Sequence, residues 1–416
     1  MKVHHFFWFD FFQKVNLKDT GMEFIKLCRE LAKRKGYFLY IAGGPVRDVL
    51  LSRSVKDIDL VLEGDWEELL PDIFQKIPGK VLFKTPFYTY KIELSDGEIL
   101  DLVTARREIY PEPASLPLVE KATYKDDIMR RDFTLNALIY GLTPPFEEKI
   151  VDLVSGLEDL KDGKINPLHL DTFIDDPTRV FRGIRFKVRF QFNYSTSFYE
   201  ALKRAKSFSV FSKLSSSRLA KELKLFFLKE EEKNWISLVE DLINLSLPEV
   251  LGIRIRELKE DDLLYFRKAK ALLKSKDLDK FYLLSLIELD EFSLERLDFS
   301  NEEQKKILRW YDYGFREIFK EEKDLFEKVE SLEKMPLYVL FRLSLEEKFK
   351  HFFEIWEKLR KIKPTLTGED LMKIGITDGQ EIGKILKELR RKKFLGEIKC
   401  KEDEINWVKG KLGVPS

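Results

Sequence analysis

The chain has 416 residues, 44% of them hydrophobic, which is enough to bury sizeable cores in about two to four domains. Its 74 basic and 73 acidic residues nearly cancel, which excludes binding driven by a strong global charge, so any nucleic acid must be held by a local basic surface. The chain has no apolar run near the ~20 residues of a membrane span, no signal-peptide cleavage pattern, and two cysteines without metal or disulfide spacing; these features predict a cytoplasmic protein.

The secondary-structure pattern changes near residue 150. Before it, the periodicity predicts short strands at 37–42, 57–62, 80–84, 88–94 and 98–104, and helices at 22–35, 45–52 and 66–77. From about residue 155 onward, amphipathic segments with charged faces predict helices packed on helices. We place the boundaries at loops and charge runs, which gives parts at 1–150, 151–230, 231–325 and 326–416. The 35% of charged residues, mostly Lys, Glu and Arg, is typical of heat-adapted proteins.

A glycine pair separates the first predicted strand from a short helix. Gly43 and Gly44 follow the apolar run 37–42 and precede a segment in which Val46 and Val49 have helical spacing. Glycine lets a backbone approach a polyphosphate closely, and the first N–H groups of a helix are unpaired donors. This strand, turn and helix therefore predict a phosphate-binding site.

Two aspartates follow on the next predicted strand. Asp57 and Asp59 alternate with Ile58 and Leu60, so on a strand both carboxylates point to one face. Mg²⁺ is held by one or two protein carboxylates together with substrate phosphates, so the pair suits a Mg²⁺ site beside the glycine turn. The alternative is a pair of acidic residues that simply face water at a strand end.

Asp101 is the candidate for a third acidic residue of this site. It lies on the strand 98–104 with Ile99 and Val103 on its own face, where a charge is unusual unless a cation is near. A catalytic carboxylate satisfies this condition, and so does a structural salt bridge to Arg106 or Arg107.

Three long segments in this order resemble the class II tRNA nucleotidyltransferase and bacterial poly(A) polymerase family. They are GGPVRDVLLSRSVKDIDLVLEGD at 43–65, RRDFTLNALIYG at 130–141 and DDPTRVFRGIRF at 175–186, and the segment 364–386 resembles the family's tail. The resemblance implies an enzyme that adds nucleotides to an RNA 3′ end without a nucleic-acid template. It also implies an α/β nucleotidyltransferase head with a mixed sheet, followed by an all-α neck, body and tail.

The family reads the incoming base with an acidic-Asp-x-x-Arg motif, which here is Asp176 and Arg179 with Asp175 in place of the usual Glu. ATP and CTP present an amino donor beside a ring-nitrogen acceptor, so a carboxylate beside a guanidinium accepts A or C and repels U or G. Spacing alone allows another interpretation, in which the acid stabilises a helix N-terminus and forms a solvated i, i+3 ion pair.

The resemblance implies further contacts to the nucleotide. It suggests Arg131 for the nucleotide and Asn136 for the ribose or a phosphate, while Arg182 and Arg185 continue the Arg179 face at three-residue steps. An exposed arginine stripe is the alternative for these. The predicted nucleotide-binding residues are Gly43, Gly44, Arg47, Arg131, Asn136, Asp176, Arg179, Arg182 and Arg185.

Two segments bear on specificity. Residues 106–125 contain three prolines and no periodicity, so they predict a loop, which resembles the flexible element that family members use to add the final A. After the neck the family commonly has a Glu-Arg pair. This chain has Ser217 before Arg218, so the role of the family's glutamate is not assigned to a residue here.

The strongest RNA-binding signal is in the tail, where Lys384, Lys387 and Arg391 have the i, i+3, i+7 spacing of a helix face. Such runs are also common on solvated surfaces. We predict a tRNA 3′-end nucleotidyltransferase that adds the terminal A, with Mg²⁺ as cofactor and the tRNA acceptor arm and ATP as partners, without an obligate protein partner. A full CCA-adding enzyme that also uses CTP, a poly(A) polymerase, and a catalytically silent RNA-binding protein are the alternatives.

Overall fold

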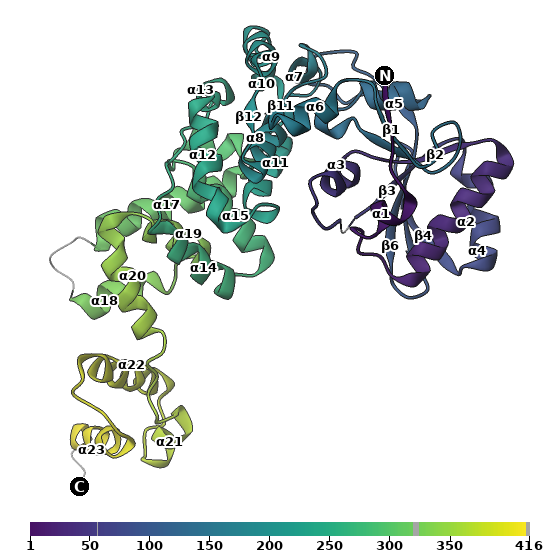
Figure 1. The fold of residues 1–416 in the computed structure, drawn as a ribbon. Coiled ribbons are helices and arrows are strands. Elements are labelled where there is room, and N and C mark those ends of the chain that lie inside the picture. The colour runs from purple at the N-terminus through teal and green to yellow at the C-terminus, as the bar shows by residue number, and fades with distance from the viewer. Residues whose placement is uncertain (56, 319–323, 413–416) are drawn as a thin grey trace. The chain divides into compact units, whose positions relative to one another are not determined.

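The computed structural model describes residues 1–55, 57–318 and 324–412, which form two compact units, Met1–Gly252 and Ile253–Ser416 (Figure 1). The first unit contains both the predicted head and the predicted neck. The end of the predicted body at 319–323 and of the predicted tail at 413–416 lies outside the described residues. The boundaries near 150, 230 and 325 stay predictions.

An eight-stranded mixed sheet lies at the centre of the predicted head. Its order is β1 (Lys2–His5), β10 (Lys149–Asp152), β9 (Ile139–Gly141), β2 (Phe38–Ala42), β3 (Asp59–Glu63), β6 (Ile99–Thr104), β5 (Thr89–Leu94) and β4 (Gly79–Lys84). Among these strands only β3 and β6 pair in parallel, and every other neighbouring pair is antiparallel. The predicted mixed sheet is therefore confirmed.

The five predicted strands are present in this sheet, and the other three strands of the sheet were not predicted. The added strands are β1, β9 and β10, which have only three or four residues each. The helices are α1 (Trp8–Phe12), α2 (Asp19–Lys35), α3 (Gly44–Leu50), the 3₁₀ turn η1 (Trp66–Glu68) and α4 (Leu70–Lys76). All but α1 match predicted ranges. One detail of the prediction was wrong, because β3 begins at Asp59 and Asp57 precedes it.

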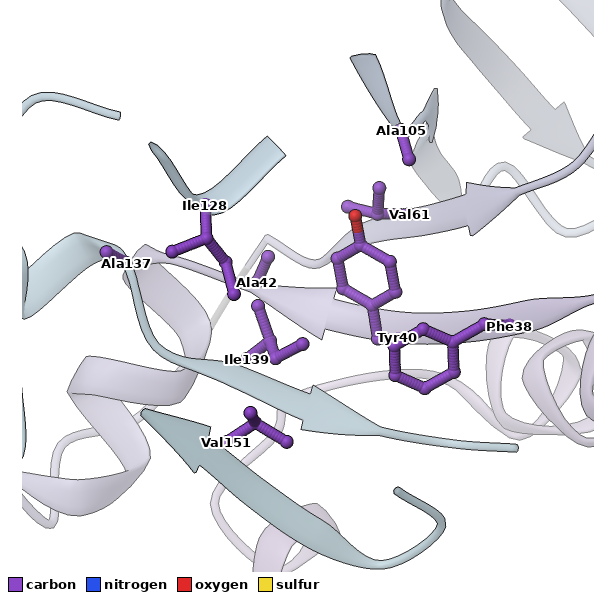
Figure 2. Close-up of a cluster of buried hydrophobic side chains, with 9 residues drawn as sticks. All are labelled: Phe38, Tyr40, Ala42, Val61, Ala105, Ile128, Ala137, Ile139 and Val151. Carbon is purple, nitrogen blue, oxygen red and sulfur yellow. The ribbon is translucent and has the colours of Figure 1, made fainter. Parts of the chain in front are cut away.

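One face of the sheet is covered by a compact apolar cluster (Figure 2). Phe38 and Tyr40 of β2 stack with ring centroids 5.0 Å apart, and Val61, Ile139 and Val151 contribute from β3, β9 and β10. Every residue of β2 is buried, as expected for a strand covered on both faces. This burial fixes the register of β2, and so the place where the chain emerges at the glycine pair.

The segment 106–125 is not a loop throughout, which corrects the prediction. It forms an antiparallel hairpin of β7 (Arg106–Ile109) and β8 (Leu118–Lys121), which is followed by α5 (Tyr124–Met129). Four-residue strands are too short to show periodicity, and the prolines mark only the turn between them. Residues 110–117 form the loop.

The remainder of the first unit is mostly helical. It comprises η2 (Thr134–Asn136), α6 (Gly156–Lys161), α7 (Thr172–Asp175), α8 (Thr178–Phe190), α9 (Thr196–Ser207), α10 (Val210–Lys213), α11 (Ser216–Leu228), η3 (Glu232–Asn234), α12 (Trp235–Asn244), α13 (Leu247–Leu251) and the two-residue strands β11 (Lys164–Ile165) and β12 (Asn193–Tyr194). Helix α8 packs against α11 and α12. A Cβ on its Gly183 would lie 2.7 Å from Phe198 and 2.9 Å from Phe133, so this glycine lets α8 pack closely beside the chain that leads into β9.

The second unit consists of helices in its described residues, as predicted. They are α14 (Asp262–Leu272), α15 (Ser275–Leu286), α16 (Glu291–Arg296), α17 (Asn301–Ile318), α18 (Leu325–Leu332), α19 (Leu337–Ser344), α20 (Glu347–Leu359), α21 (Gly368–Lys373), α22 (Gly379–Leu395) and α23 (Lys401–Lys411). Helix α19 is buried and packs against α15 and α20. Across the described parts of the whole chain, no helix is both long and apolar enough to cross a membrane.

Candidate active site

A cavity of about 890 Å³ lies within the first unit, where the chain leaves β2 and enters β3. Its volume is that of a typical small-ligand site. The lining includes both aspartates of the predicted metal site and all the predicted nucleotide-binding residues: Gly43, Gly44, Arg47, Asp57, Asp59, Arg131, Asn136, Asp176, Arg179, Arg182 and Arg185. The structure therefore gathers residues from four separate segments of the sequence around one space.

Position 43 must be a glycine for two reasons, its backbone conformation and the close approach of Arg131. Gly43 has φ 77° and ψ −125°, which side chains rarely adopt, and a Cβ there would lie 2.6 Å from Nη1 of Arg131. Gly44 then begins α3. Any larger residue at position 43 would displace the Arg131 guanidinium from the cavity wall.

The two aspartates reach the cavity although only one lies on the strand. Ile58 and Leu60 are buried while Asp57 and Asp59 are exposed, so the alternation extends into the segment before β3. The pKa of Asp59 is raised from its ordinary value, because surrounding protein atoms limit hydration of the carboxylate and because Asp101 and Asp57 add negative charge, against the opposing effect of Arg131.

Asp101 is the register partner of Asp59 across the parallel β3–β6 pair. Its cationic neighbour is Lys91 of β5, with Nζ 3.3 Å from Oδ1, so the predicted alternative of a salt bridge to Arg106 or Arg107 was wrong. Those arginines pair instead with Glu108 and Glu120. Lys91 faces Asp101 directly across the antiparallel β5–β6 pair, a contact that the sequence does not reveal.

These carboxylates fit a partly protein-held Mg²⁺. Over residues 1–55, 57–318 and 324–412, no group of three His, Cys, Asp or Glu side chains could by itself hold a metal ion. Two carboxylates that open onto a cavity, with phosphate oxygens to complete the shell, are the arrangement that Mg²⁺ uses in nucleotide sites. Asp57 and Asp59 fit that donor set.

A buried carboxylate positions two arginines beside the aspartates. Asp127 is fully buried and accepts hydrogen bonds from Arg130 at 2.7 Å and from Arg131 at 2.9 Å. Burial alone would raise the pKa of Asp127, but the two guanidinium groups lower it to about 2. Nε of Arg131 is buried and has no hydrogen-bond partner in the described structure. Asp127 and the Asn136 carbonyl, which accepts from Nη1 at 3.3 Å, therefore hold the Arg131 guanidinium in place at the cavity wall.

A second buried carboxylate connects three further lining residues. Asp132 accepts from Asn136 Nδ2 at 3.0 Å and from Arg182 Nε at 2.6 Å, and Arg47 Nη1 donates to Asn136 Oδ1 at 2.5 Å. Burial opposes ionisation of Asp132, yet Arg182 and Asn136 lower its pKa to about 2. Asn136 is thus held on both sides, which fixes the orientation of its amide.

Asp176 and Arg179 both line the cavity, but they do not form the expected i, i+3 pair. Helix α8 begins at Thr178, so Asp176 lies before the helix, where its Oδ1 accepts from the Thr178 N–H at 3.0 Å. Arg179 is buried and donates to Thr172 Oγ1 at 2.7 Å and to the Arg130 carbonyl at 2.9 Å. Asp176 therefore bonds the first N–H of the helix, as the alternative interpretation expects, but it does not form the solvated ion pair with Arg179 that the same interpretation expects.

The partner of Asp176 is Arg218, a contact that the sequence did not predict. Arg218 Nη2 donates to Asp176 Oδ1 at 2.7 Å, and Arg218 Nη1 donates to the carbonyl of Ala114, in the loop 110–117, at 2.8 Å. Tyr110 of the same loop accepts from Arg179 Nη2 at 3.2 Å. Only a recognised motif around position 218 could have found this contact, because 42 residues separate the two partners.

The other arginines of α8 are not an exposed stripe. Arg185 is buried and donates to the buried Glu230 at 2.8 Å, while Arg182 is half-exposed in the cavity. Glu222 of α11 also lines the cavity, and burial raises its pKa while Arg182 opposes the rise. The predicted RNA-binding cations lie on α22 in the second unit, where Lys387 pairs with Glu330 at 2.6 Å and Arg391 pairs with Asp324.

Residues 39–166 match the family model described as the poly(A) polymerase head domain. An A-adding tRNA nucleotidyltransferase of Aquifex aeolicus is 33% identical over 85% of this chain, and this chain spans 44% of that protein's length. Another A-adding tRNA nucleotidyltransferase, from Halalkalibacterium halodurans, is 28% identical over 94% of this chain and 93% of its own length.

Two solved structures extend the comparison to the fold. A CCA-adding enzyme in its apo form II superposes with a TM-score of 0.80 at 24% identity, over 99% of this chain and 100% of that chain. A tRNA-processing enzyme complex superposes with a TM-score of 0.64 at 30% identity, over 88% of this chain and 99% of that chain. The chain belongs to the tRNA nucleotidyltransferase and poly(A) polymerase family.

Proposed function

We propose that this chain is a template-independent nucleotidyltransferase that adds the terminal A to the 3′ end of tRNA from ATP. The observation that carries the proposal is the single cavity of about 890 Å³ in which Asp57 and Asp59 face an arginine wall and the Asp176–Arg179 motif. The names of the two A-adding relatives support the choice of tRNA and of A.

In the reaction the 3′-hydroxyl oxygen of the RNA attacks the α-phosphorus of ATP, the hydroxyl loses its proton, and pyrophosphate leaves. Mg²⁺ held by Asp57, Asp59 and the triphosphate would neutralise phosphate charge and favour ionisation of the hydroxyl. Arg131 and Arg182 are held by buried carboxylates, so they present oriented donors to the triphosphate without a loss of side-chain freedom on binding. Asp101, the register partner of Asp59 on the neighbouring strand, does not line the cavity itself, but it adds negative charge beside Asp59 that would favour a bound cation.

Selection of adenine requires the protein to place one acceptor and one donor opposite the Watson–Crick edge of the base. Asp176 accepts from the exocyclic amino group of adenine, and a guanidinium donates to the ring nitrogen. Arg179 is the predicted donor. Arg218, which bonds Asp176 directly, holds the acceptor in place. A uracil or guanine edge would bring a carbonyl oxygen against the carboxylate. It would also bring the N–H of the base ring against the N–H groups of the guanidinium, so that two donors face each other.

Three RNAs test the proposal: tRNA that lacks CCA, tRNA that ends in CC, and single-stranded oligo(A), each with ATP alone and with ATP plus CTP. We expect one A on the CC-ending tRNA, poor or no addition of CC, and little reaction on oligo(A). Efficient extension of the shortest tRNA to CCA would replace the proposal with full CCA addition, and long tails on oligo(A) would replace it with poly(A) synthesis. Absence of pyrophosphate release on all three would favour a catalytically silent RNA-binding protein.

A further inference from the structure

A second cavity, of about 340 Å³, adjoins the active-site cavity in the first unit. The two cavities share Arg189, in the last turn of α8, and Lys229, which follows α11. The second cavity adds Arg53 from the loop after α3, and Lys233 from η3. A positively charged route therefore leads out of the active-site cavity, between the head and the helices α8 and α11.

The cations of this route are only partly neutralised. Glu230 is buried and is shared by Arg185 at 2.8 Å and by both Nε and Nη2 of Arg189. One carboxylate thus faces two guanidinium groups, and it holds the Arg189 fork in a fixed orientation. The other acid, Glu231, pairs with Lys233 at 2.7 Å.

Two cations, Arg53 and Lys229, form no salt bridge within the described residues, although the charge of Arg53 acts on Glu231. Arg53 lies over the Phe190 ring at 4.8 Å and donates to the Arg189 carbonyl at 3.4 Å, so it is held at the rim of the cavity by contacts that leave its charge in place. Beside Lys229, the Leu228 side chain is 51% exposed in the wall of the first cavity. The route thus combines cations outside salt bridges with the exposed apolar side chain of Leu228, which suits a nucleotide strand better than a free anion.

We propose that Arg53, Arg189 and Lys229 bind the phosphodiester groups of the single-stranded RNA 3′ end as it enters the active site. The inference rests on the proposed function. The triphosphate of ATP belongs beside Asp57 and Asp59 in the first cavity, so the shared wall is left for the other polyanion of the reaction. The RNA 3′ end must approach the same metal site, and phosphate spacing along a strand requires several separated cations.

The test compares the double variant Arg53→Gln/Lys229→Gln with a matched control, Lys26→Gln/Arg34→Gln, which removes two exposed cations of α2 that line neither cavity. Binding of CC-ending tRNA without ATP is measured over a range of salt, together with the KM for ATP. We expect the double variant to bind about tenfold more weakly, with the log–log salt slope lowered by about 1.4, or roughly 0.7 for each single-strand phosphate that is no longer neutralised. The KM for ATP should stay within about twofold of the parent value.

A tRNA trimmed back to its last base pair identifies the strand, because the double variant should bind it as tightly as the parent does. An equal weakening on the trimmed tRNA would overturn the 3′-end assignment, and a raised KM for ATP with unchanged tRNA binding would assign the cations to the triphosphate instead. If the two double variants show the same tRNA affinity and the same salt dependence, Arg53 and Lys229 are ordinary surface charges and not an RNA-binding site. A parent that binds tRNA but adds no A would overturn the proposed function, while weaker binding confined to the CC-ending tRNA would still support this site.

Discussion

Arg218 Nη2 donates to Oδ1 of Asp176 at 2.7 Å, while Nη1 of the same guanidinium donates to the carbonyl of Ala114 at 2.8 Å. One arginine thus connects the acid proposed to read the base with the loop 110–117. Because the guanidinium is planar and rigid, a shift of the loop changes the environment of Asp176 directly.

Removal of the base-reading contacts should relax nucleotide selection. We expect Asp176→Ala, Arg179→Ala and Arg218→Ala each to lower discrimination against UTP and GTP by about tenfold or more, since a hydrogen bond to a charged group contributes about 1.5–3 kcal/mol. Single-turnover incorporation of each nucleotide on CC-ending tRNA measures the effect. In base discrimination the Asp176/Arg218 double variant should be no worse than the Asp176 variant, because Arg218 acts on the base only through its bond to Asp176. Arg204→Ala breaks an exposed pair with Asp171 and is the control; unchanged rejection of UTP in all three variants would locate base selection elsewhere.

The metal-site aspartates should be required for chemistry and not for RNA binding. We expect Asp57→Ala and Asp59→Ala each to lower nucleotide addition by on the order of a hundredfold or more, because each removes a Mg²⁺ ligand and its charge stabilisation. tRNA affinity should stay close to that of the parent. Pyrophosphate release and tRNA binding are measured on the same preparations, with Asp72→Ala, an exposed acid of α4, as control. Either variant with activity within tenfold of the parent would contradict the assignment.

The tail cations should contribute to tRNA affinity in competition with their acidic neighbours. Neutralisation of Lys384, Lys387 and Arg391 together should flatten the salt dependence of tRNA binding by up to about three units of slope, roughly 0.9 for each duplex phosphate that is no longer neutralised. Conversely, Glu330→Gln and Asp324→Asn free Lys387 and Arg391 and should strengthen binding. If removal of the acids leaves the tRNA affinity unchanged, the α22 cations have a structural role and do not contact tRNA. The same conclusion would follow if the triple variant and the parent showed equal salt dependence of tRNA binding.

Head stability should fall in acid in a window set by Asp127. Its pKa in the folded chain, about 2, lies below the ordinary value of 3.8, so its stabilisation is complete above about pH 5 and is lost as the pH falls toward 2. The shift corresponds to about 2 kcal/mol. Hydrogen exchange of β2 amides, measured between pH 7 and pH 3, reports this destabilisation. Asp127→Asn should be less stable at neutral pH, because it leaves Arg131 without its carboxylate partner and Arg130 with Glu108 alone, and its stability should fall less with acid. Parallel acid dependence in the two proteins would contradict this origin.

The sequence predicted the strand, glycine turn, helix and acidic strand at 37–63 because that order is carried by adjacent residues with clear periodicity. It did not reveal β1, β9 and β10, since strands of three or four residues become stable only through pairing with distant segments. Contacts between distant residues were missed for the same reason. Lys91 meets Asp101 through strand register, and Arg218 meets Asp176 through the packing of α11 beside α8. Spacing identified the glycine turn and the paired aspartates, and the resemblance to the family identified Arg131, Asn136 and the Asp176–Arg179 motif, but neither identified the partners of these residues.

The parallel pairing of β3 with β6 has a consequence for how the enzyme is assembled. Asp59 lies opposite Asp101 in the same register that buries Leu60 opposite Leu102. A slip of β3 by one residue would move Leu60 to the face that Asp59 now occupies and would turn Asp59 into the core on the other face, so no folded form could keep the packing and misalign the acids. A molecule with the wrong register would therefore expose apolar surface and would also lack activity. Activity of the metal site thus indicates that the head has folded with the correct register.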